Sequence, residues 1–165
     1  MVKIKRYIAS TTFSGFSMME LILIIVILGI FATVAMTRTD SGLSTIREQI
    51  AIDQITNDID LAKSMAFGKH ETISIVYSTN NESYTIYSGV GNDRQPISDF
   101  PNSDNGVISL DNSTMRDVDL QSATFLNNSP ELQFLPLGDL VSGGQITLNT
   151  KTISIEPVTG KWTIN

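Results

Sequence analysis

The pattern of hydrophobic and polar positions changes its period twice along the chain. Residues 16–36 form a nearly unbroken apolar segment, FSMMELILIIVILGIFATVAM, in which Glu20 is the one charged residue. A helix rises about 1.5 Å per residue, so this segment would span roughly 31 Å, close to the ~30 Å hydrocarbon thickness of a bilayer. The pattern therefore predicts a membrane-spanning helix at residues 16–36.

Helical spacing continues beyond this segment. Residues 37–44 (TRTDSGLS) are poor helix formers, which makes Gly42 a candidate hinge. Apolar residues then recur at spacings of three and four and predict one stripe facing a core. The stripe comprises Ile46, Ile50, Ile52, Ile55, Ile59, Ala62 and Ala66. Charged residues are expected on other, solvated faces; they are Asp53, Asp58, Asp60 and Lys63. The prediction is one long helix over residues 16–67, with a candidate interruption near Gly42.

After Gly68 the period changes to two, which is typical of strands. Residues 72–77 and 84–88 alternate around an Asn80-Asn81 turn and predict a hairpin. Residues 145–149, 152–156 and 161–164 predict a three-strand meander, and residues 107–110, 119–125 and 132–135 are further candidate strands. Residues 89–105 are polar, contain Pro96 and Pro101, and predict a long surface loop.

Composition removes several function classes. The chain has 165 residues, no Cys and one His, so it has no disulfide framework, Cys-based zinc site or thiol nucleophile. His70, between Lys69 and Glu71, is expected on the surface, and no phosphate-binding glycine motif is present; Gly143-Gly144 is expected to be a tight connection. We therefore expect no catalytic residue, no metal, no cofactor and no enzymatic activity.

Charge is divided between the two ends of the chain. Lys3, Lys5 and Arg6 precede the apolar segment, whereas all 17 acidic residues follow Gly15. The positive-inside rule keeps the basic end cytoplasmic and predicts export of the acidic part. An acidic surface repels nucleic acid, so nucleic-acid binding is not expected.

Three interpretations of the apolar segment compete. It can be an ordinary signal peptide with a cleavage site near Thr33-Val34-Ala35, or an uncleaved anchor. Both leave Glu20 unexplained, because a carboxylate inside a membrane helix costs roughly 2.5 to 3.5 kcal/mol near its centre and less toward its end.

The third interpretation comes from a resemblance. Gly15-Phe16-Ser17-Met18-Met19-Glu20, with a basic leader before it and the apolar run after it, resembles the class III signal of type IV prepilins and pseudopilins. This resemblance implies that a membrane-embedded prepilin peptidase cuts after Gly15 and methylates the new amine of Phe16. It also implies that Glu20 meets the amine of a neighbouring subunit.

The charges are compatible with this role for Glu20. Glu20 lies four residues, roughly 6 Å, deeper along a helix than Phe16, so it cannot easily reach its own terminus. A neighbour shifted by about one turn would pair the two charges in a low-dielectric environment.

Two later segments indicate a particular class within the superfamily of type IV prepilins and pseudopilins. Residues 55–66, and residues 132–138 followed by 146–148, are similar to the GspH/FimT class of minor subunits. A proline common in the family just past the apolar block is replaced by Thr37. The resemblance implies an α+β fold with a long N-terminal helix packed on an antiparallel, two-sheet β head. The expected parts are a cleaved leader (1–15), a membrane or filament-core helix (16–36), a hinge and amphipathic helix (37–67), and a periplasmic head (68–165).

The resulting hypothesis is a minor pilin or pseudopilin that starts or caps a type IV pilus or a type II secretion pseudopilus. Its expected partners are the peptidase, other pilins or pseudopilins and the inner membrane, with the head in the periplasm before assembly. The system could equally be a mannose-sensitive-haemagglutinin-like pilus. A tethered or secreted β-domain that binds a ligand outside any filament is the alternative. The polar residues Asn92, Asp99, Asn102, Asp104, Asn105 and Asp111 could offer oxygen ligands to calcium, but their order does not fit an EF-hand.

Overall fold

The computed structural model describes residues 15–165, so the leader residues Lys3, Lys5 and Arg6 lie outside the described part. The helix α1 spans Met18–Lys69 and includes residues 37–44 within its bounds. It ends before His70, whose φ of 55° is the left-handed conformation that commonly terminates helices. The chain divides into two compact units, one up to Asp40 and the other from Ser41 to Asn165. The finer boundaries given above stay predictions.

The first sheet of the second unit is antiparallel and contains the predicted hairpin. Its strands are β1 (Ile73–Ser78), β2 (Ser83–Ser88), β3 (Gln95–Pro96), β4 (Val107–Ser109) and β6 (Glu131–Phe134). Their order is β3-β2-β1-β6, and β4 also pairs with β2. Ile75 lies opposite Ile86 and Tyr77 opposite Tyr84, so the alternation read from the sequence gives the observed register.

The second sheet contains the predicted meander. Its strands are β5 (Ser122–Thr124), β7 (Gly144–Thr147), β8 (Thr152–Ile155) and β9 (Trp162–Ile164), in the order β5-β7-β8-β9. All the pairs are antiparallel, and Ile146, Ile153 and Ile164 lie side by side across the sheet. Within each strand the apolar residues are two positions apart, which places their side chains on one face of the sheet.

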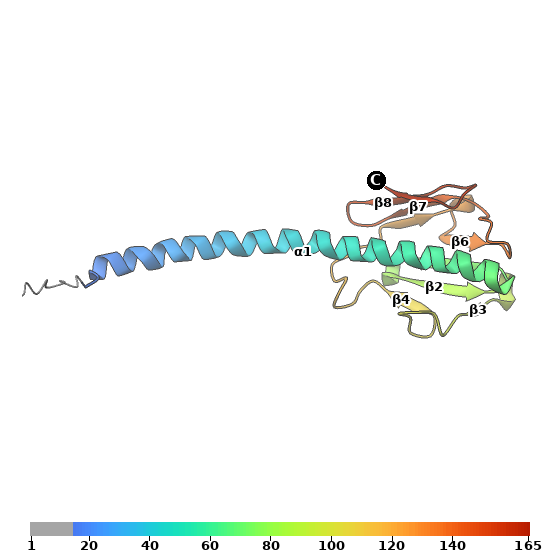
Figure 1. Cartoon of the computed structure of the whole chain (residues 1–165), viewed down its shortest axis with the longest axis horizontal. Helices are drawn as coiled ribbons and strands as arrows, with labels where there is room; N and C mark the ends of the chain where they lie inside the picture. Colours follow the sequence, from blue (N-terminus) through green and yellow to red (C-terminus); the bar gives the residue numbers. More distant parts are fainter. Residues whose placement is uncertain (1–14) are drawn as a thin grey trace, which may run out of the picture. The chain divides into compact units, whose positions relative to one another are not determined.

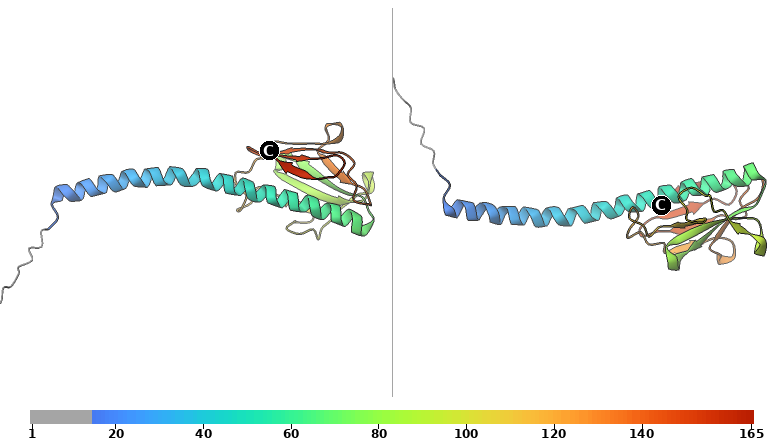
Figure 2. Two further views of the ribbon diagram at one scale, coloured as in Figure 1. Left: turned by 45° about the horizontal axis from the view of Figure 1, so that its top comes forward. Right: turned by 90° about the horizontal axis from the view of Figure 1, so that it is seen from below.

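Both sheets share one hydrophobic core with the part of α1 after Ser41. Ile52, Ile55 and Ile59 of the helix are fully buried in the same cluster as Ile75 and Ile153. In Figure 1 strands β2 and β4 lie on one side of this helical segment and β7 and β8 on the other, and Figure 2 shows both sheets alongside it from two further directions. The prediction of a helix packed on an antiparallel, two-sheet β unit is confirmed.

The predicted stripe was wrong at its first two positions. Ile46 is 57% exposed and Ile50 is 37% exposed. At 3.6 residues per turn, Ile46 lies about half a turn around the helix from the buried Ile55, so the two cannot share a face. Ala51 is buried instead.

The predicted surface loop at residues 89–105 is more ordered than a polar run suggests. It contains the short strand β3 and a 3-10 turn, η2 (Gly91–Asp93). Ile97 and Phe100 are buried in the core cluster. These two apolar residues anchor the segment, so the prediction of a wholly surface loop was wrong.

Candidate functional site

The first part of α1 carries a long apolar surface. Met18–Met36 is long and apolar enough to cross a membrane, with a mean hydropathy of 2.7, and none of its residues is buried. Leu21, Val26 and Phe31 are each more than half exposed, although their apolar side chains would be buried in most folds. A surface of this kind is suited to lipid or to other apolar helices.

The start of α1 lies directly after the predicted cleavage site. Gly15, Phe16 and Ser17 are not helical. The Ser17 hydroxyl accepts a hydrogen bond from the Met19 amide at 3.2 Å, and the Ser17 carbonyl accepts the first helical bond, from the Leu21 amide, at 3.1 Å. Ser17 is therefore the N-cap of α1.

Glu20 lies in the first turn, at the third helical position. Its side chain is exposed, and within residues 15–165 no hydrogen bond or ion pair reaches its carboxylate. A negative charge in the first turn is favourable toward the helix dipole by roughly 0.3 to 1 kcal/mol. Ser17 and Glu20 also have the S-x-x-E spacing of a capping box, but the Ser17 hydroxyl accepts from Met19, and within residues 15–165 the Ser17 amide makes no bond to the Glu20 carboxylate. Sequence reasoning missed this spacing, although it was readable.

Within the second unit, α1 carries a shorter exposed apolar stripe. Leu43, Ile46 and Ile50 are 42%, 57% and 37% exposed. Their spacing of three and four places them along one face of the helix. This face is available for contact with another helix.

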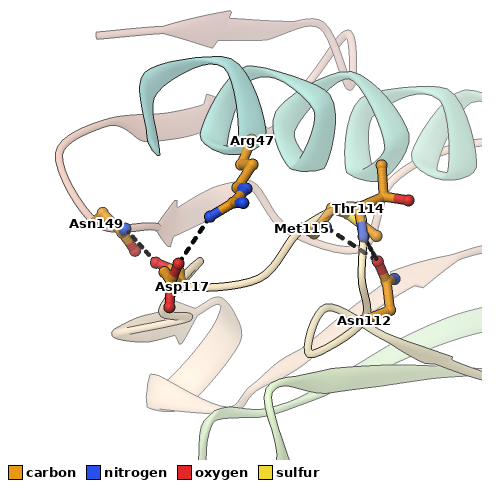
Figure 3. A network of polar contacts seen from close by, with 6 residues as sticks. All are labelled: Arg47, Asn112, Thr114, Met115, Asp117 and Asn149. Atoms are coloured by element: carbon orange, nitrogen blue, oxygen red, sulfur yellow. Dashed lines mark hydrogen bonds and ion pairs between the residues drawn. The ribbon is translucent and has the colours of Figure 1, made fainter. Parts of the chain in front are cut away.

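Three consecutive residues of α1, Arg47 to Gln49, bind two loops of the head. One loop contains Asp117 and the other contains Thr150 and Lys151. The Arg47 guanidinium pairs with the Asp117 carboxylate at 2.8 Å, and Asn149 donates to the Asp117 carbonyl at 2.8 Å. Figure 3 shows Arg47 and Asn149 converging on Asp117. Next to Arg47, the buried Glu48 carboxylate accepts bonds from the Thr150 amide at 2.7 Å and the Lys151 amide at 3.1 Å.

The remaining contacts complete this junction. The Thr150 hydroxyl donates to Glu48, and the Lys151 ammonium donates to the Gln49 amide oxygen at 2.7 Å. In the loop that contains Asp117, the Asn112 side-chain oxygen accepts hydrogen bonds from the Thr114 and Met115 amides, as Figure 3 also shows. We call Arg47, Glu48 and Gln49, with their partners Asp117, Thr150 and Lys151, the collar. Sequence reasoning missed the collar.

The sequence predicts Asp58 on a solvated face of the helix. This prediction was wrong, because the side chain is buried. It is 6% exposed and accepts a hydrogen bond of 2.5 Å from the Tyr84 hydroxyl. Burial raises the pKa of Asp58, and the Tyr84 bond partly opposes that rise. Burial, and then the Asp58 charge, raise the pKa values of Tyr77 and Tyr84.

The other charged residues of the predicted solvated faces remain toward solvent. Asp53 and Asp60 are exposed, and Lys63 is partly buried. The Lys63 ammonium donates to the Thr159 carbonyl at 2.9 Å, and the Trp162 indole donates to Asp60 at 3.3 Å. These contacts attach the end of α1 to β9 and the turn before it.

The described candidate calcium residues are exposed; they are Asp99, Asn102, Asp104, Asn105 and Asp111. His70 is exposed, with its ring 6.3 Å from that of Phe67. In the polar loop, the Asn105 side chain donates to the Asp104 carboxylate, and among the side chains that the structure describes, in residues 15–36, 42–91 and 93–165, no group of three His, Cys or acidic residues is arranged to hold a metal ion.

Gly143 and Gly144 allow a close approach between strands. A Cβ on Gly143 would lie 2.4 Å from the Ile155 carbonyl oxygen, and one on Gly144 would lie 2.3 Å from the Phe125 ring. An open pocket of about 690 Å³ lies beside them, bordered also by Pro157. Its size falls in the range of small-molecule sites.

No protein-family model matches the sequence, and no curated protein matches it either. Among solved structures, the chain is similar to the type IV minor pilin FimU of Pseudomonas aeruginosa strain PAO1. The identity is 16%, the match covers 71% of this chain and 87% of that chain, and the TM-score is 0.46.

Proposed function

We propose that this chain is a minor pilin or pseudopilin of the GspH/FimT type, a structural subunit without catalytic activity. The precursor is held in the inner membrane by residues 16–36 with its head in the periplasm. The prepilin peptidase cuts after Gly15 and methylates Phe16. The mature subunit then helps to start or cap a type IV pilus or a type II secretion pseudopilus.

One observation carries this proposal: an exposed apolar helical segment, Met18–Met36, has its one acid, Glu20, in the first turn. Hydrocarbon tails can cover the apolar side chains, but they offer no counter-charge to the carboxylate. A neighbouring subunit with a free amine at Phe16 provides both an apolar surface and a positive charge. Within the second unit, the exposed stripe Leu43, Ile46 and Ile50 offers a further apolar surface to such neighbours.

Assembly of such subunits would give a fibre instead of a closed oligomer. A contact between the amine of one chain and the acid of the next is heterologous, because the two surfaces differ. Repeating a heterologous contact with a rise and a rotation generates an open helix. A minor subunit with this contact can occupy one end of the fibre.

The pocket beside Gly143 and Gly144 favours a second candidate function, ligand binding by a tethered or secreted β unit outside any filament. The mature N-terminus distinguishes the two. Mass spectrometry of the protein extracted from its native membrane should show a chain that begins at methylated Phe16. A chain beginning at Met36 would indicate ordinary secretion, and one retaining Met1 a simple anchor; either result would overturn the filament proposal.

A further inference from the structure

The Gly15–Phe16 bond lies in a short non-helical stretch, and one side chain fixes where that stretch ends. Gly15, Phe16 and Ser17 precede α1, and Phe16 is 74% exposed. The Ser17 hydroxyl bonds to the Met19 amide at 3.2 Å, which satisfies one of the unpaired amides of the first turn. The helix therefore begins at Met18, two residues beyond the bond.

A peptidase needs this boundary for a geometric reason. A peptide bond inside a helix has its amide and carbonyl groups engaged in the helical ladder, and its atoms are packed by neighbouring turns. An extended bond presents those groups to a catalytic site. A helix that began only three residues earlier would include the Gly15–Phe16 bond.

We propose that Ser17 is a positioning residue for prepilin processing: its capping bond stops α1 from extending across the Gly15–Phe16 bond and so keeps that bond available to the peptidase. This inference rests on the proposed function, since it presupposes cleavage after Gly15. It assigns to Ser17 no contact with the peptidase.

The residues on either side of Ser17 make the start of α1 sensitive to a single capping hydrogen bond. Residues 10–15, Ser-Thr-Thr-Phe-Ser-Gly, are poor helix formers but contain no proline, so they do not forbid a helix. The strongly helical residues begin at Met18. Between the two, the cap at Ser17 selects one helix start over earlier ones. Removing that cap changes the population ratio of the later and the earlier helix start by the factor that corresponds to the free energy of the cap.

The test measures cleavage of the full-length precursor by purified prepilin peptidase in vesicles of bacterial lipid. Ser17→Ala removes the cap and shifts the ratio of the two helix starts about fivefold toward the earlier one, so kcat/KM for cleavage should fall, by at most that factor, because it follows the fraction of precursor whose bond is extended. Ser17→Thr and Ser17→Asp keep a capping oxygen with different side chains, and both should be cut within about twofold of the unchanged precursor.

Thr33→Ala is the matched control. It also removes a hydroxyl from α1, one that donates to the Ile30 carbonyl at 2.8 Å, but far from the bond that is cut. Its cleavage rate should be unchanged. Carbonyl chemical shifts of Gly15 and Phe16, labelled in the same full-length precursors, should move toward helical values in Ser17→Ala only.

The outcomes separate the two proposals. If the unchanged precursor is not cut after Gly15, the proposed function fails. If it is cut and Ser17→Ala is cut at the same rate, the function stands and the role of Ser17 is overturned. Slow cleavage of the Thr and Asp variants, equal to that of Ser17→Ala, would also overturn it, because the peptidase would then be recognising serine itself.

Discussion

Two buried tyrosines on neighbouring strands differ in whether their hydroxyl groups have a partner. Tyr84 donates to Asp58, whereas the Tyr77 hydroxyl has no hydrogen-bond partner in residues 15–165. Their rings lie 5.5 Å apart, and each residue is at most 3% exposed. An unpaired buried hydroxyl carries a desolvation cost that its partnered neighbour avoids.

The pair therefore predicts opposite responses to the same chemical change. Tyr84→Phe leaves the Asp58 carboxylate buried without its donor and should lower the free energy of unfolding by about 1–3 kcal/mol. Tyr77→Phe removes a hydroxyl that bonds to nothing and should leave stability unchanged or slightly higher. Urea unfolding of the full chain in detergent, followed by the fluorescence of Trp162, measures both. Equal losses in the two variants would contradict the assigned hydrogen bond.

Asp58 predicts a pH dependence of stability. Burial raises its pKa in the folded chain, so the folded state keeps the proton to a higher pH than the unfolded state, whose Asp pKa is about 3.9. The free energy of unfolding should therefore fall as the pH rises from about 4 through the folded pKa, and should be level above it. Tyr77 and Tyr84 stay neutral over this range because burial raises their pKa values.

Asp58→Asn should remove this fall while still accepting a bond from Tyr84. The measurement is the same unfolding assay at a series of pH values between 4 and 8, with Asn57→Ala as the control. Asn57 is exposed and has no titratable group, so its substitution should leave the pH profile unchanged. Parallel profiles for the unchanged protein and Asp58→Asn would show that this carboxyl does not titrate as inferred.

At the scale of elements, the collar determines how α1 is held by the loops of the head. Glu48 is 4% exposed and accepts bonds from two backbone amides and a hydroxyl of the turn at Thr150 and Lys151. Arg47 and Asp117 are more exposed, with side-chain exposures of 29% and 66%, and a pair of this kind contributes only about 0.2–1 kcal/mol. Glu48 is thus the dominant contact of the collar.

Glu48→Ala should destabilise the head by about 2–4 kcal/mol, because it leaves two amides of a tight turn without an acceptor. Arg47→Ala should cost less than about 1 kcal/mol. Asn57→Ala, on the same helix but exposed and outside the collar, is the control and should be within ~0.5 kcal/mol of the unchanged protein. Unfolding in urea measures all three. A loss for Arg47→Ala as large as that for Glu48→Ala would reverse the order of the two contacts.

The elements differ in how well the sequence predicts them. Strands β1 and β2 were predictable because alternation and the turn between them are local signals. The partners of Glu48 lie 102 and 103 positions away, and that of Asp58 lies 26 positions away, so no local pattern marks either acid as buried. The exposure of Ile46 was misread because spacing alone does not tell which of two helical faces meets a sheet. Ser17 was readable from its distance to Glu20.

At the scale of the whole molecule, Glu20 has two possible uses that must be separated. It is placed to support the start of α1 through the dipole and the capping-box spacing, and it is also the acid proposed to meet the Phe16 amine of another subunit. The capping-box part of the first use needs no charge, whereas its dipole part and the whole of the second use do. Glutamine serves in a capping box as well as glutamate does, so Glu20→Gln keeps the capping-box part, loses only the roughly 0.3 to 1 kcal/mol of dipole interaction, and removes the second use.

We therefore expect Glu20→Gln and Glu20→Ala both to be cleaved and methylated at Phe16 yet to fail at assembly. Removing one member of a desolvated ion pair costs about 3–5 kcal/mol, so the share of subunit in sheared filaments should fall at least about a hundredfold for both variants. Quantitative immunoblots of filament and membrane fractions measure that share. Glu71→Gln removes an exposed charge from the head and should assemble normally. Normal assembly of Glu20→Gln beside failure of Glu20→Ala would instead assign Glu20 to the helix start, and the contact between subunits would have to depend on the apolar helices alone.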